Sequence, residues 1–143
     1  MPTATPSKLS LWLGLITATL LALALGAFWC LLELRCGYEL PWFALICGYV
    51  VARVLRAHGY AGTKRGIAIA ALCTALACGY SQCLLAVADV AQAMGISLRA
   101  ALPQIGFDFT FAAARARLDA IAVLCFAAAI VLAAVLTGMR RRQ

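Results

Sequence analysis

The residues best suited to chemistry form a small polar group inside the third apolar stretch of the sequence. Tyr80, Ser81 and Gln82 are adjacent there. Positions seven apart share a helix face, so Thr74 lies with Ser81, and Gln82 lies with Asp89. Polar groups in lipid are satisfied by neighbouring helices. The face therefore predicts either interhelical hydrogen bonds, which we favour, or a polar path or ligand pocket.

The acidic residues argue against coupled transport and against catalysis. A proton- or cation-coupled pump usually buries a carboxylate in the middle of a membrane span. Here every acidic residue lies near the end of an apolar stretch: Glu33, Glu39, Asp89, Asp108 and Asp119. The sequence also has no Ser/His/Asp arrangement, no paired acid/base carboxylates and no phosphate-binding loop. We therefore expect a protein that is not an enzyme and needs no cofactor.

The seven cysteines raise the question of redox or metal chemistry. No C-x-x-C pair, common in redox and zinc sites, is present. Cys30, Cys36, Cys83 and Cys125 fall toward one end of their apolar stretches, and an oxidising compartment would allow a disulfide among them. Cysteine also packs as a small apolar residue. His58, the single histidine, lacks the partners that a metal site needs.

Composition places most of the chain in lipid. Hydrophobic residues make up 66% of the sequence and charged residues 12%, whereas soluble domains carry about 25% charged residues. The net charge of +7 comes from basic residues at the ends of apolar stretches, which is the membrane pattern. No nucleic-acid-binding motif accompanies this charge, so we expect a lipid bilayer and no nucleic acid as a partner.

Three stretches are long enough to span a bilayer: 9–32, 66–88 and 118–138. The first follows Lys8, as a signal peptide would, but its apolar core is too long for one and no cleavage site follows. We interpret it as a retained first span.

A fourth stretch, 40–57, is apolar but short. As a helix it would rise about 27 Å, nearly the thickness of the hydrocarbon core. Pro41 suits a first helical turn, and Trp42 suits the interface. The long side chains of Arg53 and Arg56 can reach the headgroups. We predict a complete span; a re-entrant or interfacial segment is the alternative.

The basic residues predict the orientation of a bundle of four transmembrane helices. With four spans, one side would carry Lys8, Arg53, Arg56, Lys64, Arg65, Arg140, Arg141 and Arg142. The other side would carry only Arg35, Arg99, Arg115 and Arg117. The positive-inside rule then places both termini in the cytoplasm, in a bacterial inner membrane. The expected lipid and topology anchors are Trp42, Arg53, Arg56, Lys64, Arg65, Arg140, Arg141 and Arg142.

Small residues recur at every fourth position of the spans, which lets helices approach closely in lipid. These stripes are Gly14, Ala18, Ala22, Gly26 and Cys30; Ala44, Gly48 and Ala52; Ala71, Ala75, Gly79 and Cys83; and Cys125, Ala129, Ala133 and Thr137. They indicate packing within the bundle, or an interface with a second copy or another membrane protein.

We expect one membrane domain, 1–143, with an external connection over 89–117. Within it, Ser97 can cap a short helix over 97–102, which Pro103 ends. Phe107, Phe109 and Phe111 alternate with polar residues. This alternation suits a strand, but a segment anchored at the bilayer interface is favoured.

Part of the chain, 37–80, resembles a family of small bacterial four-span membrane proteins. The matching positions are Gly37, Tyr38, Trp42, Gly48, Tyr49, Arg53, Gly59 and Gly66. The resemblance implies four spans and no catalytic residues, because no activity is established for these proteins. The many cysteines depart from the family pattern.

These patterns together predict a compact inner-membrane bundle that acts as an accessory or scaffold subunit. It would pack against a larger membrane protein or against itself. A small transporter or channel, with the third span lining the path, is one alternative. An immunity or protection protein that blocks another membrane protein is a second.

Overall fold

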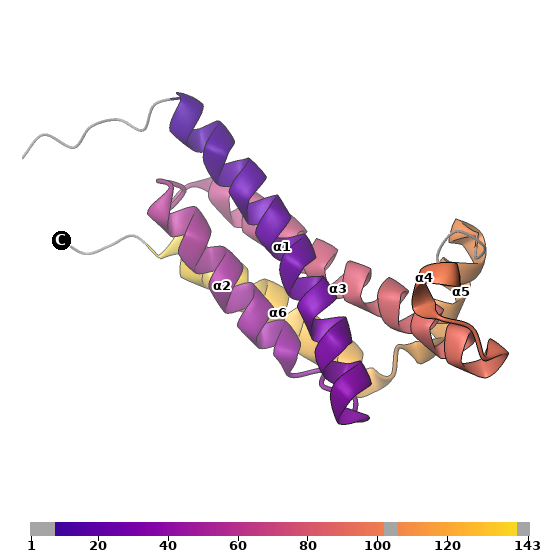
Figure 1. Cartoon of the computed structure of the whole chain (residues 1–143). Helices are drawn as coiled ribbons and strands as arrows, with labels where there is room; N and C mark the ends of the chain where they lie inside the picture. The colour runs from indigo at the N-terminus through magenta and orange to yellow at the C-terminus, as the bar shows by residue number, and fades with distance from the viewer. Residues whose placement is uncertain (1–7, 102–105, 140–143) are drawn as a thin grey trace, which may run out of the picture.

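The computed structural model describes residues 8–101 and 106–139, and the regular structure in these residues is entirely helical. Its helices are α1 (Lys8–Cys36), α2 (Phe43–Ala57), α3 (Lys64–Met94), α4 (Leu98–Ala101), α5 (Phe107–Arg117) and α6 (Ala120–Gly138). The predicted all-α fold class is therefore confirmed for this part of the chain. In Figure 1, α1, α2, α3 and α6 run along the length of the molecule.

The four long helices form one bundle. α2 packs against α1, α3 and α6, and α3 packs against both α1 and α6. Small side chains fill most of the contact layer, with Trp29 as the largest fully buried side chain. Phe43 and Phe126 pack against its ring, with centroids 5.7 Å away in each case. In the core, small side chains therefore let the helices pack closely, and one aromatic cluster forms around Trp29.

Three helices are long and apolar enough to cross a membrane, by length and composition: the segment Leu11–Cys36 of α1, and α3 and α6 in full. This property is consistent with a membrane protein. α2 has 15 residues, and it is not among the three. Backbone bonds extend its helical path backwards, because Phe43 N–H donates to Leu40 O at 3.0 Å and Ala44 N–H donates to Pro41 O at 3.2 Å.

α3 continues beyond Asp89, where we expected the span to end. Its end is a Schellman motif: Ile96 N–H donates to Ala91 O at 3.0 Å, and Gly95 N–H donates to Gln92 O at 3.1 Å. Gly95 has φ +67°, a conformation that glycine adopts without strain. Ile96 packs against the buried side chains of Val87 and Ala91. These contacts stabilise the extra helical turns.

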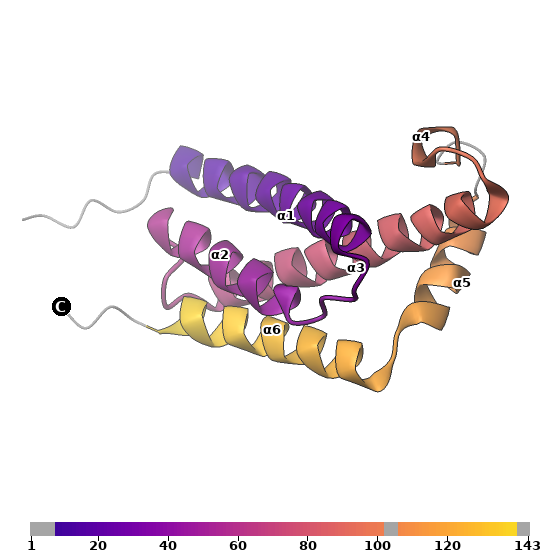
Figure 2. The same cartoon turned by 60° about the horizontal axis from the view of Figure 1, so that its bottom comes forward.

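The expected external connection is more structured than the sequence suggested. The predicted short helix appears as α4, where Ala100 N–H donates to the Ser97 hydroxyl at 3.4 Å. The alternating phenylalanines lie in a helix, α5, so the strand alternative is wrong. The alanines that follow are strong helix formers, and Ala114 is buried where α5 contacts α3. Figure 2 shows α5 bridging from the start of α6 to the far end of α3.

The opposite end of the bundle is closed by the loop between α2 and α3. The Tyr60 hydroxyl donates to Leu11 O at 2.8 Å, and Gly62 N–H donates to Thr137 O at 2.8 Å. The hydroxyl of Thr63 caps α3 by accepting from Gly66 N–H at 3.0 Å. The start of α1 and the end of α6 therefore lie at the same end of the molecule (Figure 1).

Candidate functional site

The most elaborate polar arrangement surrounds Glu33, near the end of α1. Its side chain is only 7% exposed. One carboxylate oxygen accepts from Trp29 Nε1–H at 2.7 Å and from Leu40 N–H at 2.8 Å. Leu40 lies just before α2, so Glu33 joins α1 to the start of α2. A buried carboxylate with two donors is well satisfied.

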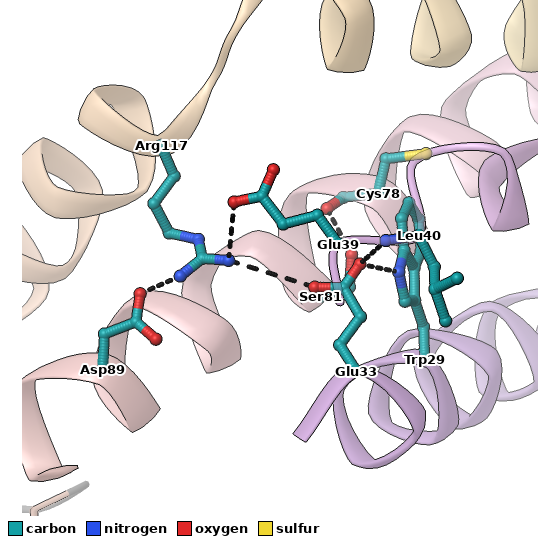
Figure 3. A network of polar contacts seen from close by, with 8 residues as sticks. All are labelled: Trp29, Glu33, Glu39, Leu40, Cys78, Ser81, Asp89 and Arg117. Carbon is teal, nitrogen blue, oxygen red and sulfur yellow. Dashed lines mark hydrogen bonds and ion pairs between the residues drawn. The ribbon is translucent and has the colours of Figure 1, made fainter. Parts of the chain in front are cut away.

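Arg117, at the end of α5, completes a cluster that we call the Arg117 clasp: Glu33, Glu39, Asp89 and Arg117. Its Nη2 lies 3.9 Å from Glu33 and 3.8 Å from Glu39, and its Nη1 pairs with Asp89 of α3. Figure 3 shows the guanidinium between Asp89 on one side and the two glutamates on the other. The clasp therefore connects α1, the loop before α2, α3 and the end of α5.

A cavity of about 330 Å³ opens beside the clasp, lined by all four of its residues together with Tyr38 and Gln92, among others. Three carboxylates face one guanidinium, so the cavity has an excess of negative charge. Nε of Arg117 is buried and has no hydrogen-bond partner among the described residues; a cavity of this size could hold a water to accept from it. In the described part of the chain, no three His, Cys, Asp or Glu side chains are arranged to hold a metal ion.

Of the polar group on α3, Asp89 forms an interhelical bond, to Arg117 of α5, whereas Thr74 and Ser81 form none within the described residues. Thr74 and Ser81 are fully buried, but each donates to its own helix. The Thr74 hydroxyl donates to Ala70 O at 2.8 Å, and the Ser81 hydroxyl donates to Cys78 O at 2.8 Å. Serine and threonine bonded back in this way need no partner from another helix.

The other members of the predicted polar face are only partly brought together. Tyr80 is exposed on the outside of α3. Gln82 is half-buried; it lines an apolar groove and also a small pocket that Glu33, Glu39 and Arg117 line. Asp89 pairs with Arg117 in the clasp. The structure therefore brings Thr74 and Ser81 into the core, leaves Tyr80 outside, and places Gln82 and Asp89 beside Arg117.

Small-residue stripes on three helices are used within the bundle. Ala18, Ala22, Ala44 and Ala52 are fully buried, as are Ala129, Ala133 and Thr137. A Cβ on Gly48 of α2 would stand 2.6 Å from Ala129 O of α6. One on Gly26 of α1 would stand 2.9 Å from Ala77 O of α3, and one on Gly14 would meet His58 at 2.7 Å. These glycines mark close helix contacts.

The stripe on α3 differs, because it faces out of the bundle. Ala75 and Gly79 are exposed, and Ala71 is half-buried. A Cβ on Gly79 would meet nothing within 4 Å. Leu72 and Leu76 are exposed on the same helix. Small and large apolar residues on one outer face suit the close approach of another helix.

The residues expected to act as lipid and topology anchors differ in their exposure and contacts. Trp42, Arg53, Lys64 and Arg65 are exposed, as anchors would be. Arg56 instead donates through Nη1 to Leu136 O of α6 at 2.7 Å. The Arg56 guanidinium thus donates to a carbonyl in the last turn of α6, where a positive charge is favourable. Arg140, Arg141 and Arg142 lie outside the described residues.

All seven cysteines are free thiols, so the disulfide that an oxidising compartment would allow is not formed in this structure. Cys36 is exposed, and Cys30, Cys47, Cys73 and Cys78 are buried. Burial of this kind matches the use of cysteine as a small apolar residue. His58 is half-buried, with Nδ1 2.9 Å from Val54 O.

The Arg117 clasp was missed from the sequence, although a signal for it existed. Glu33, Glu39 and Asp89 each flank an apolar stretch, and Arg117 precedes the last one. Alternating helix directions bring these four positions to the same end of a four-helix bundle. The opposite charges then predict ion pairs, but only tertiary packing decides which residues meet.

Comparison with protein-family models, curated proteins and solved structures finds no match for the chain.

Proposed function

We propose that the protein is a non-enzymatic accessory or scaffold subunit of a bacterial inner-membrane complex. Its partner would be a larger membrane protein or a second copy of the chain. The observation that carries this proposal is the outer face of α3, where Ala75 and Gly79 remain exposed while the other small-residue stripes are buried in the bundle. In lipid, such a face gains stability by packing against another helix.

The proposed topology has four spans with both termini in the cytoplasm. α2 lies alongside the three longer helices (Figures 1 and 2). With the helical turn that begins at Leu40, its path rises about 27 Å, close to the roughly 30 Å of a hydrocarbon core. The end that holds Arg56, Lys64 and Arg65 would then face the cytoplasm, in accord with the positive-inside rule.

A transporter or channel has less support. Thr74 and Ser81 are buried and bond to their own helix, whereas Gln82 and Asp89 both lie beside Arg117 at one end of the bundle. A continuous path along α3 would need all four groups on one open surface. An immunity protein that blocks another membrane protein would use the same outer face of α3, so the partner would distinguish it from a subunit.

The test is purification of the tagged full chain from native membranes into nanodiscs, followed by native mass spectrometry. We expect a stoichiometric membrane partner or a second copy. The double variant Ala75→Leu/Gly79→Leu should lose it, because two bulky side chains would separate the helices. Ala24→Leu on α1 and Ala128→Leu on α6 are matched controls at exposed positions and should retain it. A monomer without a partner from native membranes would overturn the proposal.

A further inference from the structure

An apolar groove of about 390 Å³ lies between α3, α5 and α6. Ala75, Gly79 and Cys83 line it from α3, and Phe126 and Ile130 line it from α6. The volume falls within the range of small-molecule sites, roughly 300–1,000 Å³. Along α3 the groove extends about 12 Å from Cys83 to Ala75, close to the roughly 15 Å depth of one leaflet's hydrocarbon.

One end of the groove is closed by α5, which contributes Phe111, Ala114 and Arg115. α5 bridges from the start of α6 to the far end of α3 (Figure 2), so its side chains lie at one end of the groove. A flexible acyl chain can start beside α5 and run along the groove toward Ala75. The shape therefore suits an acyl chain within the groove.

The charge at the closed end identifies the headgroup. Arg115 is exposed, and it pairs with no carboxylate within the described ranges, whereas Arg117, two residues later, is held by the clasp. Arginine is well suited to phosphate, because its fork of N–H donors matches two phosphate oxygens. An acyl groove that ends at a free guanidinium combines the two features of an anionic lipid.

We propose that this groove binds one anionic phospholipid, with an acyl chain between α3 and α6 and the phosphate at Arg115. Under the topology proposed above, the lipid belongs to the extracytoplasmic leaflet. The lipid would fill the space under α5 and join α5 to the bundle. Ala75 and Gly79 border both the groove and the proposed partner face, so the lipid site is tested at other residues.

The test reconstitutes the full chain in nanodiscs of phosphatidylglycerol and phosphatidylcholine with matched chains, then counts retained lipids by native mass spectrometry. We expect one phosphatidylglycerol per chain. Arg115→Gln should weaken its retention about fivefold, the effect of one basic residue on an anionic headgroup. Arg99→Gln, an exposed arginine of α4 outside the groove, should leave retention unchanged. Equal loss in both variants would mean general surface attraction and would overturn the site.

A second pair of variants tests the acyl groove. Cys83→Trp would fill the groove and should release the lipid, whereas Leu72→Trp, at an exposed position outside the groove, should not. Equal retention of phosphatidylcholine, or retention by Cys83→Trp, would overturn the proposal. Helix content measured by circular dichroism checks that each variant folds. Arg115→Gln should still retain the membrane partner, so failure of the lipid site and failure of the accessory function are distinguishable.

Discussion

At the scale of single residues, Glu33 and Glu39 differ in what they stabilise although both lie near Arg117. Glu33 is buried and satisfies Trp29 Nε1–H and Leu40 N–H. Glu39 is 70% exposed and lies 3.8 Å from the guanidinium. Removing an acceptor from buried donors costs about 1–3 kcal/mol for each donor, whereas an exposed ion pair contributes about 0–1 kcal/mol.

We therefore predict that Glu33→Ala lowers the free energy of unfolding by about 3 kcal/mol, and that Glu39→Ala lowers it by less than about 1 kcal/mol. Unfolding of the full chain in mixed micelles, followed by circular dichroism, would measure both values. Similar losses in the two variants would show that Glu33 acts only through its charge and not through Trp29 and Leu40.

At the scale of helices, two glycines of the small-residue stripes have opposite surroundings. Gly48 faces the backbone of α6, where an added Cβ would stand 2.6 Å from Ala129 O. Gly79 faces open space. Alanine has the higher helix propensity by about 0.8–1.0 kcal/mol, so the surroundings decide the sign of the change.

Gly48→Ala should push α2 away from α6 and lower the free energy of unfolding by about 1–3 kcal/mol. Gly79→Ala should leave the stability of the isolated chain unchanged or raise it by up to about 1 kcal/mol. Thermal unfolding of the two purified variants gives the comparison. If Gly79→Ala destabilises the isolated chain as much as Gly48→Ala does, the outer face of α3 is already occupied by a second copy.

The helices themselves could be predicted from apolar length, because a long apolar stretch in lipid satisfies its backbone only as a helix. The sequence did not predict that α3 continues to Met94, since that depends on the turn at Gly95 and the contact of Ile96 with Ala91. The sequence also did not predict which small-residue stripe faces outward. The stripes on α1 and α3 have the same spacing, and only the packing partners distinguish them.

At the scale of the whole molecule, the two ends of the bundle carry different charge. Arg56, Lys64 and Arg65 lie at the end where α1 begins, and the Arg117 clasp lies at the other end. Arg53, Lys64 and Arg65 are exposed toward the first end, and Arg35, Arg99 and Arg115 are exposed toward the clasp end. In the sequence, Lys8 precedes the apolar part of α1, and Arg140, Arg141 and Arg142 follow α6. With these residues counted, the positive-inside rule predicts that the first end faces the cytoplasm.

This orientation requires that α2 crosses the membrane, which accessibility can test. In a chain with the other cysteines replaced, Cys36 should react with an impermeant maleimide added to intact spheroplasts, because it is exposed at the clasp end. A Lys64→Cys variant of the cysteine-free chain should react only after permeabilisation. If α2 did not cross, the two positions would lie on the same side and react together. Labelling after lysis controls for burial, because both positions are exposed in the folded chain.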